Sequence, residues 1–251
     1  MVLPEKGAAV SDTLEPVQNQ SLHQACVRSM EAKILSGEWS AGKRLRSERT
    51  LAAELKVSRP VVHHALVDLA AKGLVRIVPR RGVYVNDYRT SGSLTVLSTL
   101  LAYQAQEIDL ELMYDLIEAR KVIETDTARL AARNRTTSQL KRIAAVIDQE
   151  QVSDSENSSL LTELDFNFHL EIALSSGNRV YPMILNSFRS VYTHLTGRFF
   201  TVYKGSEPVQ RVFSAHKKIL EAIREQEPEK AAELMAAMLD EGAEFLLKIG
   251  G

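Results

Sequence analysis

An aspartate and a histidine lie four residues apart within an apolar stretch, LDFNFHLEI at 164–172. The strict alternation of apolar and polar residues favours a strand, but the neighbouring segments have helical patterns, and we therefore expect a helix. A helix places Asp165 and His169 on one face. Their neighbours are apolar, so both side chains are expected to point into the interior. Because burial of an unpartnered carboxylate or imidazole is costly, the sequence predicts a buried polar pocket here.

Basic residues gather in a different part of the chain, between Ser40 and Arg89. This segment has eleven lysines and arginines against four acidic residues, a net charge of +7, whereas the whole chain of 251 residues carries −1. The part from Thr90 onward carries −6. A basic segment beside an acidic body is typical of a module that binds a polyanion such as DNA.

The elements that must position these basic residues follow the order of a winged helix. A first helix is predicted over 21–37, where apolar residues recur at helical spacing. Ser47 is expected to cap a second helix, and a third is expected over 58–73, between a capping serine and a closing glycine. Two short β-branched runs flank residues 79–82 and predict a hairpin with a basic tip.

The start of the third helix carries the residues best placed to read DNA, because this end of a helix-turn-helix enters the major groove. Arg59 is expected to donate two hydrogen bonds to guanine, and Ser58 and His63 to reach phosphate or base. Further predicted DNA contacts are Arg49 in the preceding helix and Arg80, Arg81 and Gly82 at the hairpin tip.

Composition and motifs exclude several classes of protein. The single cysteine, Cys26, rules out an intramolecular disulfide framework and indicates a reducing compartment, which we expect to be the cytoplasm. No apolar run reaches the roughly 18 residues of a membrane span. The segment 37–44, GEWSAGKR, lacks the Ser or Thr of a phosphate-binding loop. HExxH and GxSxG motifs are absent, and we expect no enzyme.

The chain is therefore predicted to be mainly α-helical, with two domains. Residues 1–20 lack periodicity and are expected to form a flexible tail. Residues 21–88 are expected to form an N-terminal winged helix-turn-helix domain. The nearly continuous helical pattern over 95–251 predicts an all-α helical bundle.

The basic segment resembles the DNA-binding domain of the GntR family of bacterial transcription regulators. The motifs that carry this resemblance are SER at 47–49, VSR at 57–59 and RRGVYV at 80–85. The second half is similar to the FCD ligand-binding domain of the FadR-like branch of that family, in LIEARKVIE at 116–124, ELDFNFHLEIALSSGN at 163–178 and AHKKILEAI at 215–223. The resemblance implies a homodimer that binds operator DNA through Arg49, Arg59 and the wing.

The resemblance also implies which residues of the buried pocket bind a metal ion and an effector. Regulators of this branch place an aspartate and three histidines around a divalent metal ion that helps to hold a small carboxylate effector. Asp165, His169 and His216 match three of these ligands, and Met238 stands where the fourth is usual. Because a thioether is a poor ligand for Zn²⁺, Ni²⁺ or Mn²⁺, the site is either a three-ligand metal site or a metal-free polar pocket. Arg120 matches a family arginine and is expected to pair with the effector's carboxylate.

These observations predict a repressor whose operator affinity is controlled by a small carboxylate such as a sugar acid. Two alternatives stay open. The segments 90–100 and 175–188 resemble a fatty-acid-responsive regulator, which would make acyl-CoA the effector. A metal-dependent enzyme acting through Asp165, His169 and His216 would leave the basic segment unexplained.

Overall fold

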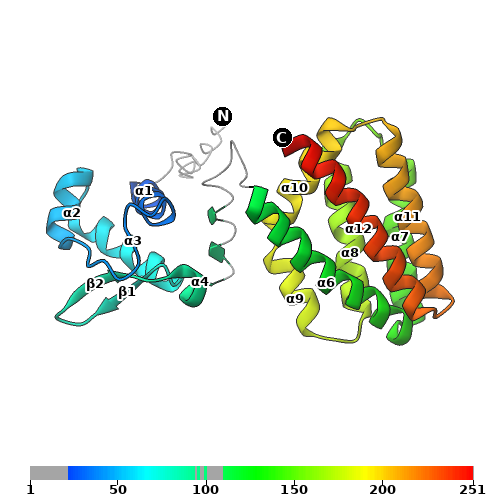
Figure 1. Cartoon of the computed structure of the whole chain (residues 1–251), viewed down its shortest axis with the longest axis horizontal. Helices are drawn as coiled ribbons and strands as arrows, with labels where there is room; N and C mark the ends of the chain where they lie inside the picture. The colour runs from blue at the N-terminus through cyan, green and yellow to red at the C-terminus, as the bar shows by residue number, and fades with distance from the viewer. Residues whose placement is uncertain (1–21, 94, 97–98, 101–109, 251) are drawn as a thin grey trace, which may run out of the picture. The chain divides into compact units, whose positions relative to one another are not determined.

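The computed structural model describes residues 22–93, 95–96, 99–100 and 110–250, and the chain divides between Asp87 and Tyr88 into two compact units. The tail expected at 1–20 lies outside the described residues, as does a break between helices expected near 107–109. Figure 1 shows the first unit in blue to teal and the second in green to red.

The first unit has the predicted order of three helices and a hairpin. Its elements are α1 (Leu22–Leu35), α2 (Glu48–Leu55), α3 (Arg59–Ala71), β1 (Val75–Val78) and β2 (Gly82–Val85). Helices α1 and α2 both pack against α3. The fully buried side chains of Met30, Leu66 and Leu69 form the centre of this unit, and Cys26 is buried among them, as a packing residue.

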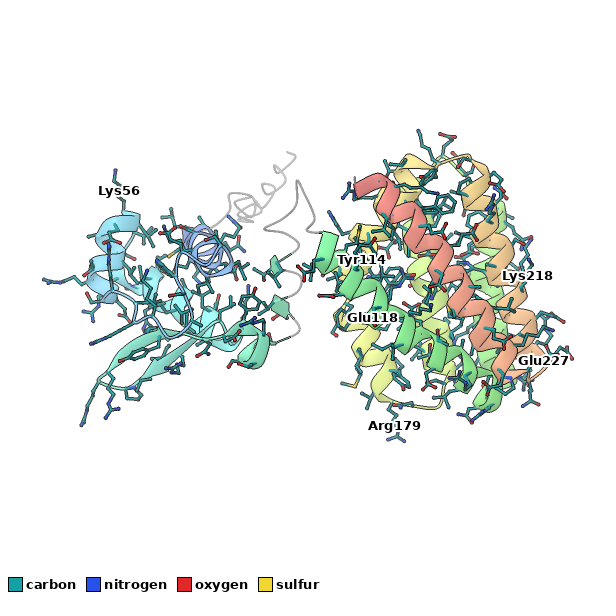
Figure 2. All side chains as sticks on the ribbon, in the orientation of Figure 1. Lys56, Tyr114, Glu118, Arg179, Lys218 and Glu227 are labelled. Atoms are coloured by element: carbon teal, nitrogen blue, oxygen red, sulfur yellow. The ribbon has the colours of Figure 1, made fainter. Side chains whose placement is uncertain are left out.

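The turn between α2 and α3 follows from a few local interactions. The Ser47 hydroxyl accepts a hydrogen bond from the Thr50 backbone N–H over 3.2 Å, which confirms the predicted cap of α2. Lys56, labelled in Figure 2, ends α2 in the left-handed conformation with φ 53°. Ser58 precedes α3 in an extended conformation, but its hydroxyl forms no capping hydrogen bond within the described part of the chain.

The hairpin is a short antiparallel pair with a tight basic tip. Val75 pairs with Val85, and Val78 pairs with Gly82. The turn is closed by a hydrogen bond from the Arg81 N–H to the Val78 carbonyl over 3.0 Å. Arg80 occupies the left-handed region with φ 61°, which is unusual for a residue with a Cβ and turns its long side chain to the exposed tip.

The second unit contains helices joined by short turns, and no strand among its described residues. Its elements are α4 (Tyr88–Ser91), α6 (Leu110–Asn134), α7 (Thr137–Val152), α8 (Ser158–Ser175), α9 (Val180–Ser187), α10 (Arg189–Val202), α11 (Glu207–Arg224) and α12 (Pro228–Gly250). None of the helices in the described ranges is both long and apolar enough to cross a membrane.

Helix α8 lies at the centre of the bundle, packed against α6, α7, α9 and α10, while α11 and α12 pack on each other and on α6 (Figure 1). This confirms that residues 164–172 form a helix despite their strand-like alternation. A helix that is covered on most sides keeps only a narrow solvated face, so apolar residues occupy most of its positions and the period of 3.6 is obscured. Because α8 is central, its Asp165 and His169 side chains face other helices and are buried, whereas Glu163 stays partly exposed.

Candidate effector site and DNA-binding face

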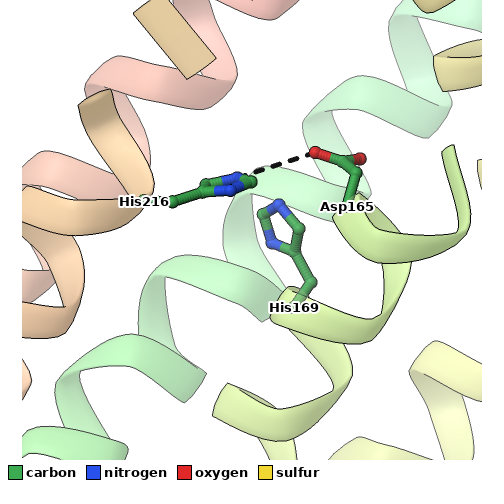
Figure 3. Close-up of side chains that lie close together, drawn as sticks. All are labelled: Asp165, His169 and His216. Carbon is green, nitrogen blue, oxygen red and sulfur yellow. Dashed lines mark ion pairs between the residues drawn. The ribbon is translucent and has the colours of Figure 1, made fainter. Parts of the chain in front are cut away.

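Asp165, His169 and His216 meet in the core of the second unit (Figure 3). The first two project from α8 one turn apart, and His216 approaches from α11. One potential ligand atom from each of the three residues lies within 4.8 Å of the other two, and Asp165 Oδ1 is 3.6 Å from His216 Nε2. All three side chains are buried. The structure thus brings together the three residues that the resemblance singled out.

A buried glutamate contacts the Nδ1 atom of each histidine of this group. His169 Nδ1 contacts the carboxylate of Glu124 on α6, and His216 Nδ1 lies 2.8 Å from Glu150 Oε1 on α7. Among the described residues, neither Nε2 atom has a hydrogen-bond partner. A carboxylate on Nδ1 fixes the ring and leaves the Nε2 lone pair free, which is the usual arrangement around a metal-binding histidine.

Arg120 joins the same cluster through Tyr192. The Arg120 guanidinium donates from Nε to Glu124 Oε1 over 2.6 Å and from Nη2 to the Tyr192 hydroxyl over 2.7 Å. The Tyr192 hydroxyl in turn donates to Asp165 Oδ2 over 2.8 Å. Arg120 is mostly buried, with 18% of its side chain exposed, and therefore lies inside the site and not on the surface.

The cluster holds more negative than positive formal charge. Glu124, Glu150 and Asp165 are three carboxylates, and Arg120 is one guanidinium, which leaves a charge of −2 while both imidazoles are neutral. Burial alone would lower the pKa of His216, but the Glu150 carboxylate outweighs burial and raises that pKa above the ordinary 6.5. This negative charge favours protonation of the imidazoles or binding of a divalent metal ion.

The Glu124 carboxylate is kept ionised despite its position. Burial alone would raise its pKa, but Arg120 and His169 outweigh burial and lower the pKa to about 2. Burial raises the pKa of the Tyr192 hydroxyl well above its usual value, so Tyr192 serves as a neutral donor. Glu124 therefore stays ionised and Tyr192 stays neutral in the network that surrounds Asp165.

A cavity of about 60 Å³ opens beside Asp165 and His169. Its other lining residues include Arg120, Thr196, Ile117, Phe199, Phe200, Val212, Met238 and Leu246. Met238, which lies on α12 and is 9% exposed, also lines this cavity.

The donor set fits a divalent ion. Two imidazoles and one carboxylate are suitable ligands for Zn²⁺, Ni²⁺ or Mn²⁺, and the Met238 thioether leaves one position open. Glu124, Glu150 and Tyr192, which support these ligands, were not found by sequence analysis. Their identity depends on which helices pack on α8, and local patterns do not contain that information.

The predicted DNA-contacting side chains lie on exposed parts of the first unit. Arg49 is in the first turn of α2, Ser58 and Arg59 open α3, and His63 follows one turn later, all exposed. Arg80 and Arg81 are exposed at the hairpin tip. Gly82 has a positive φ of 111°, and a Cβ there would lie 3.1 Å from Arg44 Nε, so this glycine is needed for the shape of the wing.

Glu48 is a further residue of this face that sequence analysis did not select. Its carboxylate oxygens lie 3.3 Å from Arg59 Nε and 2.9 Å from His63 Nδ1. The hydrogen bond with His63 and the nearby Arg59 lower the pKa of Glu48. Glu48 therefore restrains both side chains at the start of α3.

A winged helix with exposed arginines, joined in one chain to a helical domain with a buried polar cavity, defines the class of ligand-responsive transcription regulators. Residues 22–85 match the family described as bacterial regulatory proteins, gntR family, and residues 115–241 match the FCD domain. The chain belongs to the GntR family of bacterial transcription regulators and carries an FCD domain in its second half.

Individual relatives agree with this assignment. The chain is 31% identical over 192 residues to the HTH-type transcriptional regulator LutR of Bacillus subtilis strain 168, covering 76% of this chain and 85% of LutR. It is 25% identical over 223 residues to the Exu regulon transcriptional regulator of Escherichia coli K12, covering 87% and 81%.

A solved structure shares the fold. It is that of Lar, described as controlling expression of the Listeria monocytogenes agr system, and has a TM-score of 0.62 at 19% identity over 92% of this chain and 99% of Lar. The matched families and the named relatives are transcription regulators and not enzymes. This confirms the prediction that the chain is not an enzyme and removes that alternative.

Proposed function

We propose that this regulator is a repressor that releases operator DNA when a small carboxylate binds in the cavity of the helical domain. The observation that carries the proposal is the pair of buried imidazoles, His169 and His216, whose Nε2 atoms have no hydrogen-bond partner among the described residues and lie beside Asp165. A buried site with unsatisfied polar atoms and excess negative charge is costly unless it binds something.

A divalent metal ion held by Asp165, His169 and His216 would meet this demand. Zn²⁺, Ni²⁺ and Mn²⁺ all suit these ligands, and the bound ion would supply an attachment point for a carboxylate oxygen. Arg120, which lines the same cavity, is positioned to donate hydrogen bonds to that carboxylate, because its Nη1 group has no assigned partner in the described structure.

Control of DNA binding would follow from linkage between the two sites. An effector that binds better to one arrangement of the DNA-binding domains shifts the population toward that arrangement, and operator affinity falls if the half-sites no longer fit. This requires a homodimer, because a two-fold operator is read by two identical domains. Because such a regulator acts on chromosomal DNA, we expect it in the cytoplasm.

Exposed apolar side chains on α6 and α9 support the proposed dimer. Tyr114 and Val122 on α6 and Val180 and Met183 on α9 are more than half exposed (Figure 2 labels Tyr114). Helices α6 and α9 line a common cavity and are therefore neighbours. Exposed apolar side chains on neighbouring helices would contribute buried apolar area to an interface with another subunit.

Operator binding by the Arg59→Ala variant tests the proposal. A bidentate arginine–guanine contact contributes about 1–3 kcal/mol, so losing two per dimer should weaken specific binding by about 30-fold to 20,000-fold. The assay is fluorescence anisotropy with duplexes tiled across the upstream region of the protein's own gene. Arg179→Ala, an exposed arginine of the second unit, is the control and should bind normally. Equal affinity of the Arg59→Ala and wild-type proteins for every duplex would contradict this assignment.

A further inference from the structure

His63 is a titratable residue of the predicted DNA-binding face, and a single carboxylate orients its ring. Glu48 Oε1 lies 2.9 Å from His63 Nδ1, and Oε2 of the same carboxylate lies 3.3 Å from Arg59 Nε. The side chain of His63 is 54% exposed, whereas that of Glu48 is 27% exposed. The ring therefore keeps a solvent-accessible part that a bound duplex can contact.

The contact with Glu48 determines which nitrogen of the neutral ring carries the hydrogen atom. The hydrogen bond with His63 lowers the pKa of Glu48, so this carboxylate is ionised near neutral pH and only accepts hydrogen bonds. Nδ1 must therefore carry a hydrogen atom and donate it to Glu48. Nε2 of the neutral ring is then left with a lone pair, and it has no hydrogen-bond partner among the described residues.

This tautomer makes contact with a phosphate group dependent on a proton. A lone pair on Nε2 and a phosphate oxygen repel each other, because both are hydrogen-bond acceptors. Protonation changes Nε2 into a charged donor, which forms a strong hydrogen bond with a phosphate oxygen. Imidazole is the side-chain group whose charge most commonly changes near neutral pH, and the negative charge of DNA favours its protonated form.

The charged groups around His63 leave Glu48 in control of this tautomer. Helices α1 and α2 and strand β1 pack against α3. The titratable and charged groups nearest to His63 are Glu48 from α2, Arg59, His64 and Asp68 from α3 itself, and His23 from α1.

The neighbouring histidine belongs to a different group of contacts. The His64 ring centroid lies 6.1 Å from that of His63 and 6.4 Å from that of His23 on α1. Nε2 of His23 in turn lies 3.1 Å from Asp68 Oδ2. Arg76, the charged residue of β1, donates to Asn86 over 3.1 Å. In the described part of the chain, Glu48 is thus the one hydrogen-bond partner of the His63 ring.

We propose that His63, protonated on Nε2, binds a phosphate group of the operator and makes operator affinity depend on pH. The inference rests on the proposed function, because it assumes that this face binds the operator. Each neutral ring takes up one proton from solvent when DNA binds. Because a homodimer carries two such rings, its affinity for DNA falls as the pH rises and the protons become scarce.

Fluorescence anisotropy of the full-length protein at about pH 6 and about pH 8 tests the inference. The probe is the duplex that binds most tightly among those tiled across the upstream region of the protein's own gene. Each proton taken up changes the affinity by up to about tenfold per pH unit, so we expect the wild type to bind at least about tenfold more weakly at the higher pH.

Two histidine variants assign the pH dependence to one ring. The amide of the His63→Gln protein has no charge at either pH, so its affinity should change less than about threefold between them. His64→Gln is the matched control, because it removes the adjacent exposed ring of α3 and keeps the contact between His63 and Glu48. This control should retain the pH dependence of the wild type.

The salt dependence identifies phosphate as the partner of His63. Each phosphate group neutralised by the protein contributes about 0.9 to the slope of log affinity against log salt concentration. Two protonated rings per dimer should therefore make this slope steeper at about pH 6 than at about pH 8, by up to about 1.8. The difference should disappear in the His63→Gln protein.

The outcomes separate the inference from the function on which it rests. Wild-type affinity that is equal at both pH values, while Arg59→Ala still weakens binding, would overturn the inference and leave the proposed function standing. The inference also fails if the pH dependence persists in the His63→Gln protein, or if the salt slope is the same at both pH values. Binding to no duplex at either pH would overturn the proposed function as well.

Discussion

Replacement of Glu150 by glutamine tests whether buried carboxylates prepare the histidines for a metal ion. Glu150 is 1% exposed, and its Oε1 lies 2.8 Å from His216 Nδ1. Glutamine has nearly the same shape, and its carbonyl oxygen accepts the same hydrogen bond from Nδ1–H. The substitution therefore removes one of the three buried negative charges and opens no cavity.

The expected magnitude follows from the position of Glu150 behind the ligand. Loss of such a supporting carboxylate typically weakens metal binding by 10- to 100-fold, which is about 1.4–2.7 kcal/mol. The histidine keeps its ring orientation, and Asp165 remains 3.6 Å from its Nε2. We therefore expect the Glu150→Gln protein to bind Zn²⁺ about 10- to 100-fold more weakly than the wild type.

In the metal-free protein, the effect of Glu150→Gln on thermal stability should depend on pH. Although burial acts in the other direction, Glu150 raises the pKa of His216 above 6.5, so their attraction stabilises the fold fully below about pH 6.5. This stabilisation is lost as the pH rises through the raised pKa. Glu150→Gln should therefore lower the thermal midpoint clearly at about pH 5.5 and less at about pH 8.5.

Two measurements decide this prediction: Zn²⁺ titration against a competing chelator, and thermal denaturation of the metal-free protein at both pH values. Glu163→Gln is the matched control, because Glu163 is exposed on α8 and pairs with Arg189 outside the buried cluster. Unchanged Zn²⁺ affinity in the Glu150→Gln protein would refute the supporting role of this carboxylate. A loss of thermal stability that is equal at both pH values would refute the coupling to His216.

Three further substitutions probe the same model. Met238→His should supply a fourth ligand and raise Zn²⁺ affinity at least tenfold in the chelator assay; an unchanged affinity would show that α12 does not face the ion. His169→Ala should weaken the response of operator binding to effector at least tenfold, while anisotropy without effector stays within twofold of wild type. Met183→Glu should shift the protein from dimer to monomer in sedimentation velocity, and Lys218→Glu, on the exposed surface of α11, should not.

Much of the first unit could be predicted from the sequence because its signals are local. Ser47 caps α2 through a hydrogen bond to a residue three positions away, and a glycine at position 73 ends α3. The wing follows from residues 79–82, whose turn joins neighbouring strands. Even here Glu48 was not selected, because its contact with His63 crosses the turn between two helices.

In the helical unit, contacts between helices that are distant in sequence could not be predicted from local patterns. Residues 164–172 alternate like a strand, and only the packing of α8 against four other helices explains why a helix has that pattern. The charge distribution by itself indicated a polyanion-binding segment beside an acidic body, and spacing put Asp165 and His169 on one face. The tertiary structure decided that Glu150, 66 residues before His216, supports it from another helix. The partner of a buried polar group can come from any element packed against it, and sequence separation says nothing about that choice.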